Sequence, residues 1–124
     1  MATIHANTPR DALSRLESMV AMGGLSLSER TVRQQIASAL DIVVQVSRMS
    51  DGSRKVMSIS EVTGMDSETL AMQDIFVFDR SGIDENGKVR GTFRATGVRP
   101  TFAERLATSG ARLRPALFES KAEV

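Results

Sequence analysis

The chain of 124 residues contains no cysteine, no tryptophan and no tyrosine, and its single histidine is His5. Without cysteine it can form no disulfide, no thiolate nucleophile and no cysteine-based zinc site. One histidine leaves carboxylates as the other available metal ligands, so a dedicated transition-metal site is disfavoured. A Ser-His-Asp catalytic arrangement is disfavoured as well, because no G-x-S-x-G motif is present.

Three further signals are missing from the sequence. No apolar run approaches the roughly 18 residues of a membrane-spanning helix, and no secretory leader is visible at the start. Neither glycine-rich phosphate loop, G-x-x-x-x-G-K-[ST] or G-x-G-x-x-G, occurs. Gly23-Gly24 ends a predicted helix rather than opening one, so its amides are not placed to hold an anion at a helix N-terminus.

The residues that are present predict one globular domain. Hydrophobic residues make up 41% of the chain and charged residues 25%, which is in the globular range. We expect residues 1–118 to form this domain and residues 119–124 to be a short polar tail.

The first third of the chain predicts a strand followed by two helices. Residues 1–6 are expected to form a short strand that belongs to a larger sheet. Thr8-Pro9 is a helix-start signal, and the helix should run to Gly23-Gly24. The pattern Ser26-x-x-Glu29 is a capping box, which predicts a second helix with an apolar face at positions 32, 36 and 40.

The remainder predicts an antiparallel β-meander and a short helix. Strands are expected over residues 42–49, 55–63, 70–78 and 88–96, with a hairpin turn at Asp51-Gly52 and a loop over 79–87. Residues 101–110 should form a short helix, and residues 115–118 a last apolar anchor. The predicted fold class is therefore α/β.

His5 is the strongest candidate for chemistry. It ends the predicted first strand just before a helix start, where α/β proteins place groups that contact ligands. In that position it could donate to a phosphate or sense its loss, but one histidine cannot run an acid–base cycle unaided. A packed or surface histidine without a chemical role fits the same position.

The charges are unevenly distributed although the net charge is only +1. Between residues 61 and 85 seven acids accompany one base, whereas between residues 88 and 114 seven bases accompany one acid. The basic stretch suits an anionic partner or a neighbouring copy of the chain, and also an ordinary solvated surface. Nucleic acid is a weaker interpretation, because no tyrosine or tryptophan is available for base stacking.

Taken in order, the motifs resemble the ATPases of type II/IV secretion systems, and most closely the CpaF family that powers Flp/Tad-type pilus assembly. The resemblance covers nearly the whole chain. The segments that carry it are residues 3–17 (TIHANTPRDALSRLE), 33–41 (RQQIASALD), 50–54 (SDGSR), 61–65 (EVTGM), 73–78 (QDIFVF), 96–100 (TGVRP) and 102–106 (FAERL).

The resemblance implies the C-terminal part of a RecA-like P-loop motor domain, starting at the His box. It maps the His-box histidine, thought to sense the nucleotide's terminal phosphate, onto His5. It also implies a hexameric ring on the cytoplasmic face of the bacterial inner membrane. Its partners would be the rest of the motor domain and the membrane platform subunits.

ATP and Mg²⁺ would be cofactors of the parent protein. Because the Walker A and Walker B segments are absent here, we expect neither cofactor to bind tightly to this chain alone, and no hydrolysis by it. The alternative is a truncated, non-catalytic interaction module that docks on a full-length motor or its platform. Arg10 and Arg15 follow the His box and are expected to be solvated helix arginines.

Overall fold

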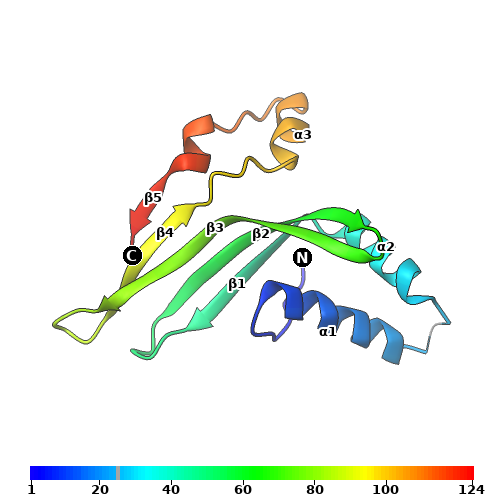
Figure 1. The fold of residues 1–124 in the computed structure, drawn as a ribbon, viewed down its shortest axis with the longest axis horizontal. Coiled ribbons are helices and arrows are strands. Elements are labelled where there is room, and N and C mark those ends of the chain that lie inside the picture. Colours follow the sequence, from blue (N-terminus) through cyan, green and yellow to red (C-terminus); the bar gives the residue numbers. More distant parts are fainter. Residues whose placement is uncertain (25) are drawn as a thin grey trace.

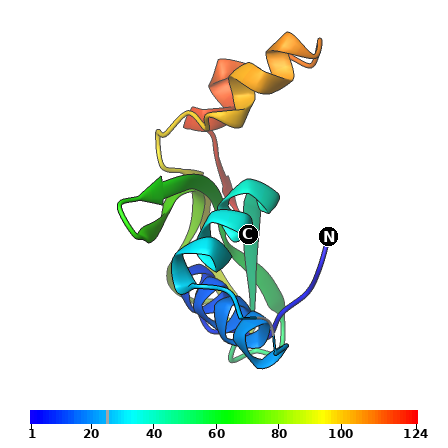
Figure 2. The same ribbon diagram turned by 90° about the vertical axis from the view of Figure 1, so that its right-hand side faces the viewer.

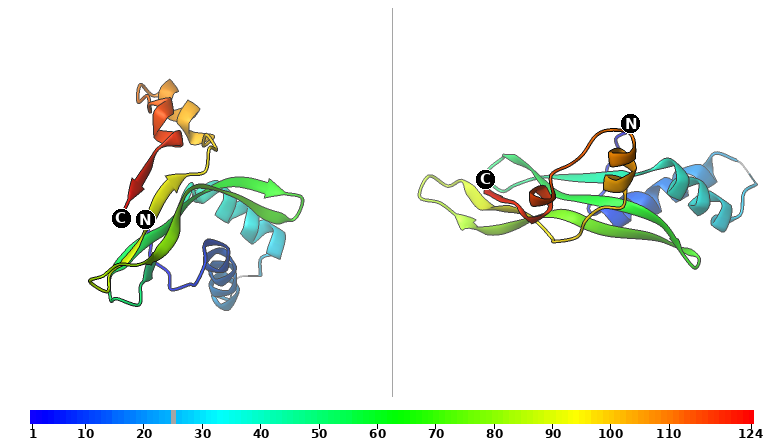
Figure 3. Two further views of the ribbon diagram at one scale, coloured as in Figure 1. Left: turned by 60° about the vertical axis from the view of Figure 1, so that its left-hand side comes forward. Right: turned by 90° about the horizontal axis from the view of Figure 1, so that it is seen from above.

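A computed structural model describes residues 1–24 and 26–124. Over these residues the fold is α/β, with three α-helices and a five-stranded antiparallel sheet of order β1-β2-β3-β4-β5. The sheet is long and twisted (Figures 1 and 3). The elements are α1 (Pro9–Met22), α2 (Glu29–Ala39), β1 (Ile42–Arg48), β2 (Arg54–Asp66), β3 (Thr69–Ile83), β4 (Val89–Ala95), α3 (Phe102–Thr108), the 3-10 helix η1 (Pro115–Glu119) and β5 (Lys121–Glu123).

Helices α1 and α2 lie on one side of the sheet (Figure 1). Their apolar faces close the first core, which comprises the buried residues Leu13, Val32, Ile36, Val62 and Leu70. The predicted cap of α1 is confirmed, since the Thr8 hydroxyl accepts from the Asp11 amide at 3.0 Å. The predicted cap of α2 is wrong by two residues, because Ser28 accepts from the Thr31 amide at 3.1 Å.

Helix α3 and η1 stand on the opposite side of the sheet (Figure 2). They close a second core of Ile75, Ala103 and Phe118. The Phe76 ring beside it lies 5.6 Å from the Phe93 ring and 6.3 Å from the Phe118 ring, measured between centroids. The predicted apolar anchor over residues 115–118 is thereby confirmed, and the phenylalanines of the meander are packing residues.

The meander is confirmed, but its central strands are longer than predicted. The pairing of β2 with β3 continues past the predicted strand end at residue 63 to Asp66, because Gly64, with φ 136°, is accommodated in a bulge. The turn that connects the two strands instead contains Ser67, which has φ 57°. In the same way β3 extends to Ile83, and the predicted loop shrinks to a tight turn in which Asp84 accepts from the Lys88 amide at 2.9 Å.

The two ends of the chain also differ from expectation. The predicted strand over residues 1–6 is wrong: these residues form no strand and join none of the five strands of the sheet. Instead, side chains hold it: Gln45 Nε2 donates to the Ala6 carbonyl and Arg15 Nη1 to the His5 carbonyl, each at 3.0 Å. At the other end, part of the polar segment 119–124 pairs with β4 as β5.

The turn between β1 and β2 is fastened to the start of β4. Asp51 accepts from the Ser53 amide at 2.8 Å and from the Val89 amide at 2.7 Å. The hydrogen bond from the Ser53 hydroxyl, followed by those from the two amides, holds the pKa of Asp51 well below its usual range. These hydrogen bonds therefore favour the charged form of the carboxylate.

We expect Asp51→Ala to raise amide hydrogen exchange at Val89 by about 10-fold, because the Val89 N–H loses its acceptor. Val89 is 1% exposed, so wild-type exchange there should be slow. Exchange measured by NMR checks this, with Asp66→Ala as the control at the exposed end of β2. Equal exchange at Val89 in the two variants would contradict the fastening role.

Candidate functional site

A groove of about 550 Å³ runs between the N-terminal segment and the free edge of β1. Residues 3–7 form one wall, and residues 44–48 of β1 form the other. His5 lies in the first wall and is exposed. Arg48, at the end of β1, and Arg54, at the start of β2, line the same groove. The structure thus brings the chain's only histidine and two arginines to one cavity.

The wall that carries His5 is held by side chains from two elements. Gln45 is buried in β1, and its amide group anchors Ala6. Arg15, one and a half turns into α1, reaches back to the His5 carbonyl. Arg10 from the same helix donates to the Leu70 carbonyl at 3.0 Å. Arg10 and Arg15 are exposed helix arginines, as expected, and each also ties α1 to its surroundings through one hydrogen bond.

The electrostatics of the groove favour an anion. Arg48 and Arg54 are direct cross-strand partners in the hairpin register, and like charges in that arrangement repel. None of the described residues that line the groove is acidic. A phosphate or carboxylate bound between the two guanidinium groups would relieve the repulsion, and a guanidinium is well shaped to donate two parallel hydrogen bonds to it.

Sequence reasoning missed Arg48 and Arg54. The signal that could have found them is the Asp51-Gly52 turn, since a hairpin closed there brings residues 48 and 54 opposite each other. Their position beside His5 was not readable, because it depends on where the N-terminal segment lies, and the sequence wrongly predicted a strand there.

The described residues offer no fit for a resident metal ion. Within residues 1–24 and 26–124, no three His, Asp or Glu side chains gather closely enough to hold one. The Walker A lysine and the acidic residue that would hold Mg²⁺ in a P-loop motor are not in the sequence. The basic groove therefore suits a phosphate group, whereas nothing described here suits the Mg²⁺ that accompanies ATP.

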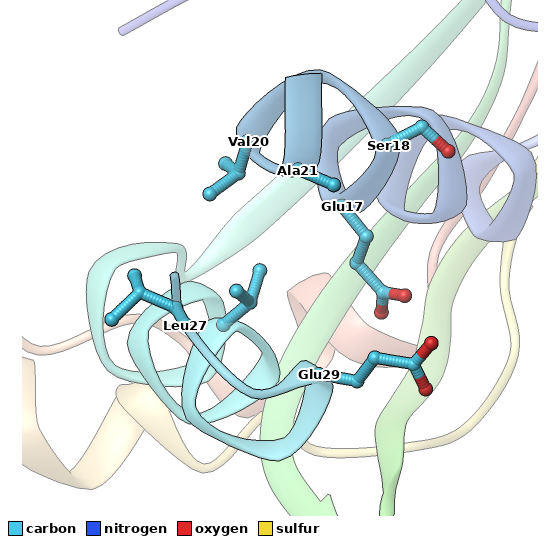
Figure 4. A pocket seen from close by; sticks show the side chains of 7 residues that line it. Glu17, Ser18, Val20, Ala21, Leu27 and Glu29 are labelled. Atoms are coloured by element: carbon cyan, nitrogen blue, oxygen red, sulfur yellow. The ribbon is translucent and has the colours of Figure 1, made fainter. Parts of the chain in front are cut away.

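A second cavity, of about 220 Å³, lies between α1 and α2 (Figure 4). Glu17 and Glu29 approach it from the two helices, next to Val20 and Leu27. Arg33 occupies the acidic side: its guanidinium lies 3.1 Å from Glu17 and 3.6 Å from Glu29. The hydrogen bond and charge of Glu17 raise the pKa of Arg33. Arg33 thus offsets one of the two negative charges, and the cavity is a helix-packing feature.

Comparisons with known proteins find distant relatives that are named as conjugal transfer proteins. No protein-family model matches the chain. Two curated relatives, "Putative conjugal transfer protein MT3759" and "Putative conjugal transfer protein Rv3659c", come from Mycobacterium tuberculosis strains CDC 1551 / Oshkosh and ATCC 25618 / H37Rv. Each is 26% identical over 93 residues, which is 75% of this chain and 26% of the relative. The match thus spans about a quarter of the relatives' length.

None of the helices described in residues 1–24 and 26–124 is long and apolar enough to cross a membrane.

Proposed function

We propose that this chain is the C-terminal part of a CpaF-type motor domain, which couples ATP hydrolysis to Flp/Tad pilus assembly or to type II/IV secretion. The observation that carries the proposal is the groove that joins His5 to Arg48 and Arg54. The conjugal-transfer name of the distant relatives agrees with a secretion-related role. In the proposed motor, this groove faces the terminal phosphate of a nucleotide held by the preceding, P-loop-containing part.

The roles in the groove follow from chemistry. His5 donates a hydrogen bond to the phosphate and loses that partner when the phosphate leaves. Arg48 and Arg54 stabilise the negative charge with their guanidinium groups. Arg15 and Gln45 are positioning residues, because their side chains donate to the carbonyls of His5 and of the next residue, Ala6.

An apolar surface on β1 supports a larger assembly. Ile42, Val44 and Val46 are 44%, 52% and 51% exposed on an edge strand. An exposed apolar edge of this kind is a pairing surface. We assign it to the rest of the motor domain, within a hexameric ring at the cytoplasmic face of the inner membrane that also meets the platform subunits. The same surface suits the alternative of a non-catalytic module docked on a full-length motor.

The groove can be tested directly because its histidine is unique in the chain. We expect inorganic phosphate at millimolar concentration to shift the His5 imidazole resonances in NMR spectra. Arg48→Ala/Arg54→Ala should remove about 90% of this response, since the guanidinium groups supply the charge that holds the anion. Arg30→Ala/Arg80→Ala is the matched control, and both of its arginines are exposed. A response of equal size in all variants would reject the groove as a phosphate site.

Native mass spectrometry with and without Mg-ATP separates the motor fragment from a freestanding nucleotide-binding protein. We expect a 13.4 kDa monomer or ill-defined oligomers without a nucleotide adduct. A discrete oligomer that retains nucleotide would contradict the proposal that the chain is only part of a motor domain. An in-frame Walker A coding sequence upstream of Met1 would in turn eliminate the freestanding module.

A further inference from the structure

The basic stretch between residues 88 and 114 does not form a continuous basic face. Three of its arginines are paired with acids from other elements: Arg90 with Asp84 at 2.8 Å, Arg105 with Asp41 at 2.9 Å, and Arg94 with Asp79. The other three are Arg99, Arg112 and Arg114. They form no ion pair and no side-chain hydrogen bond with the part of the chain that the structure describes.

These three arginines surround one pocket of about 400 Å³. Arg99 comes from the segment after β4, and Arg112 and Arg114 come from the segment between α3 and η1. The remaining walls are apolar, including the buried Ala103 of α3 and the half-buried Leu113. No acidic residue lines this pocket. Helix α3, which lines the pocket with Ala103 and Ala107, stands on the side of the sheet away from α1 and α2 (Figure 2).

The charge of the pocket selects for a ligand with several negative groups. Three guanidinium groups around one cavity repel one another, and a single carboxylate would offset only part of that repulsion. The described chain supplies no counter-charge of its own there. A ligand with two or more anionic groups would therefore gain the most electrostatic binding energy. Electrostatic attraction of this kind also speeds association.

The apolar walls select among such ligands. Apart from its three arginines, the pocket is lined by alanine, leucine and proline, which offer no side-chain hydrogen bond to a sugar or a base. None of its described lining residues is aromatic either, so the pocket has no ring on which a base could stack. An apolar side chain placed against these walls would release water, and neighbouring carboxylates would reach the arginines at the rim.

We propose that this pocket docks an acidic segment of a partner protein, in which at least two carboxylates flank a leucine-sized side chain. The inference does not depend on the proposed motor function. The phosphate groove lies along β1 and is lined by different residues, so experiments can reject either proposal without affecting the other.

The test is fluorescence anisotropy with a labelled peptide of sequence Gly-Asp-Glu-Leu-Glu-Asp-Gly and the full chain. We expect saturable binding that Arg112→Glu/Arg114→Glu weakens by about 10-fold or more. The control Arg30→Glu/Arg80→Glu makes the same change in net charge at exposed arginines elsewhere, and should alter binding by no more than about 2-fold. Thermal unfolding of each variant checks that the fold is retained.

Two further arms identify the occupant. Replacing the peptide's leucine with serine should weaken binding by about 5-fold, because the apolar contact is lost. Tripolyphosphate should compete only weakly, since it has no apolar group. The proposal is overturned if the peptide does not bind below about 1 mM, if tripolyphosphate binds more tightly than the peptide, or if both double variants weaken binding equally. Sedimentation showing self-association lost only in Arg112→Glu/Arg114→Glu would also overturn it, in favour of a second copy.

Discussion

Replacing Glu61 with alanine is expected to lower the free energy of unfolding by about 3 kcal/mol and to loosen α3 from the sheet. Glu61 lies on β2 and is 2% exposed. Its carboxylate accepts from the Gln73 side chain at 2.8 Å, from the Thr101 amide and hydroxyl at 3.0 and 2.7 Å, and from the Phe102 amide at 3.0 Å. All of these donors would lose their acceptor.

The effect should be large because Glu61 replaces the missing cap of α3. Thr101 stands at the N-cap position, but its side chain makes no capping hydrogen bond within the helix. A helix of 7 residues is marginal without tertiary contacts. The carboxylate of Glu61 satisfies the first amides of the helix and places negative charge at its positive end. It thereby joins the second core to the sheet.

Urea unfolding and amide exchange within α3 measure this effect. Glu104→Ala is the matched control, because Glu104 is an exposed glutamate on α3 itself and should change stability by less than about 0.5 kcal/mol. Glu61→Gln should fall between the two, since its amide oxygen can still accept but its NH₂ group cannot. Equal stability of Glu61→Ala and Glu104→Ala would show that α3 docks without this carboxylate.

The hydrogen bonds to Glu61 also make the stability of the fold depend on pH. Burial alone would raise the pKa of Glu61, but the hydrogen bonds from Thr101, Gln73 and Phe102 outweigh it, so the pKa lies below the ordinary 4.5. A lowered pKa in the folded state stabilises the protein above pH 4.5, and this contribution disappears as the pH falls through the folded-state value. The loss of stability on acidification should therefore be smaller in Glu61→Gln than in the wild type.

The sequence predicted elements better than it predicted contacts between them. Helix caps, the Asp51-Gly52 turn and alternating strands are local signals, and the structure confirms the helices and the meander that they indicate. Two strand ends were predicted too early, because the glycines that follow them, Gly64 and Gly82, lie at irregularities inside paired strands rather than in turns. A bulge and a turn both call for a glycine, so local composition cannot separate them.

The candidate sites depend on long-range contacts that no local pattern carries. His5 was a sequence candidate, but its partners Arg48 and Arg54 come from a hairpin more than forty residues away. Glu61 was apparent only as part of a family motif, because the groups that donate hydrogen bonds to its carboxylate lie 12 to 41 residues further along the chain. Charge counts suggested one basic face, whereas pairing with acids divides those arginines into neutralised and unpaired groups.

Substituting Gly91 by alanine is the other change expected to be strongly destabilising, by about 2–3 kcal/mol. Gly91 is a buried residue of β4 opposite Arg80 of β3. An added methyl group would lie 2.5 Å from Cζ of Phe78 and would also collide with the carbonyl oxygen of Asp79. The ring can turn away at some cost, but the carbonyl belongs to paired backbone and cannot move without disturbing the β3–β4 ladder.

The cost of Gly91→Ala should extend to the end of the chain. The amide and carbonyl of Gly91 pair with the carbonyl and amide of Val124, at 3.1 and 3.0 Å. A shifted β4 would therefore release the edge strand β5, which amide exchange at Val124 would report along with a lower urea midpoint. In a Phe78→Leu background the further loss should shrink by about 1 kcal/mol, because the ring contact is gone while the carbonyl contact remains.

Thr92→Ala is the control for this series, since Thr92 precedes Phe93 on the same strand and its side chain points to the opposite face from Gly91. It should leave the urea midpoint nearly unchanged. Full stability of Gly91→Ala, or an unaltered loss in the Phe78→Leu background, would mean that the ring and the strand have more freedom than their packing implies. The absence of a side chain at position 91 is what lets the buried Phe78 ring lie against β4.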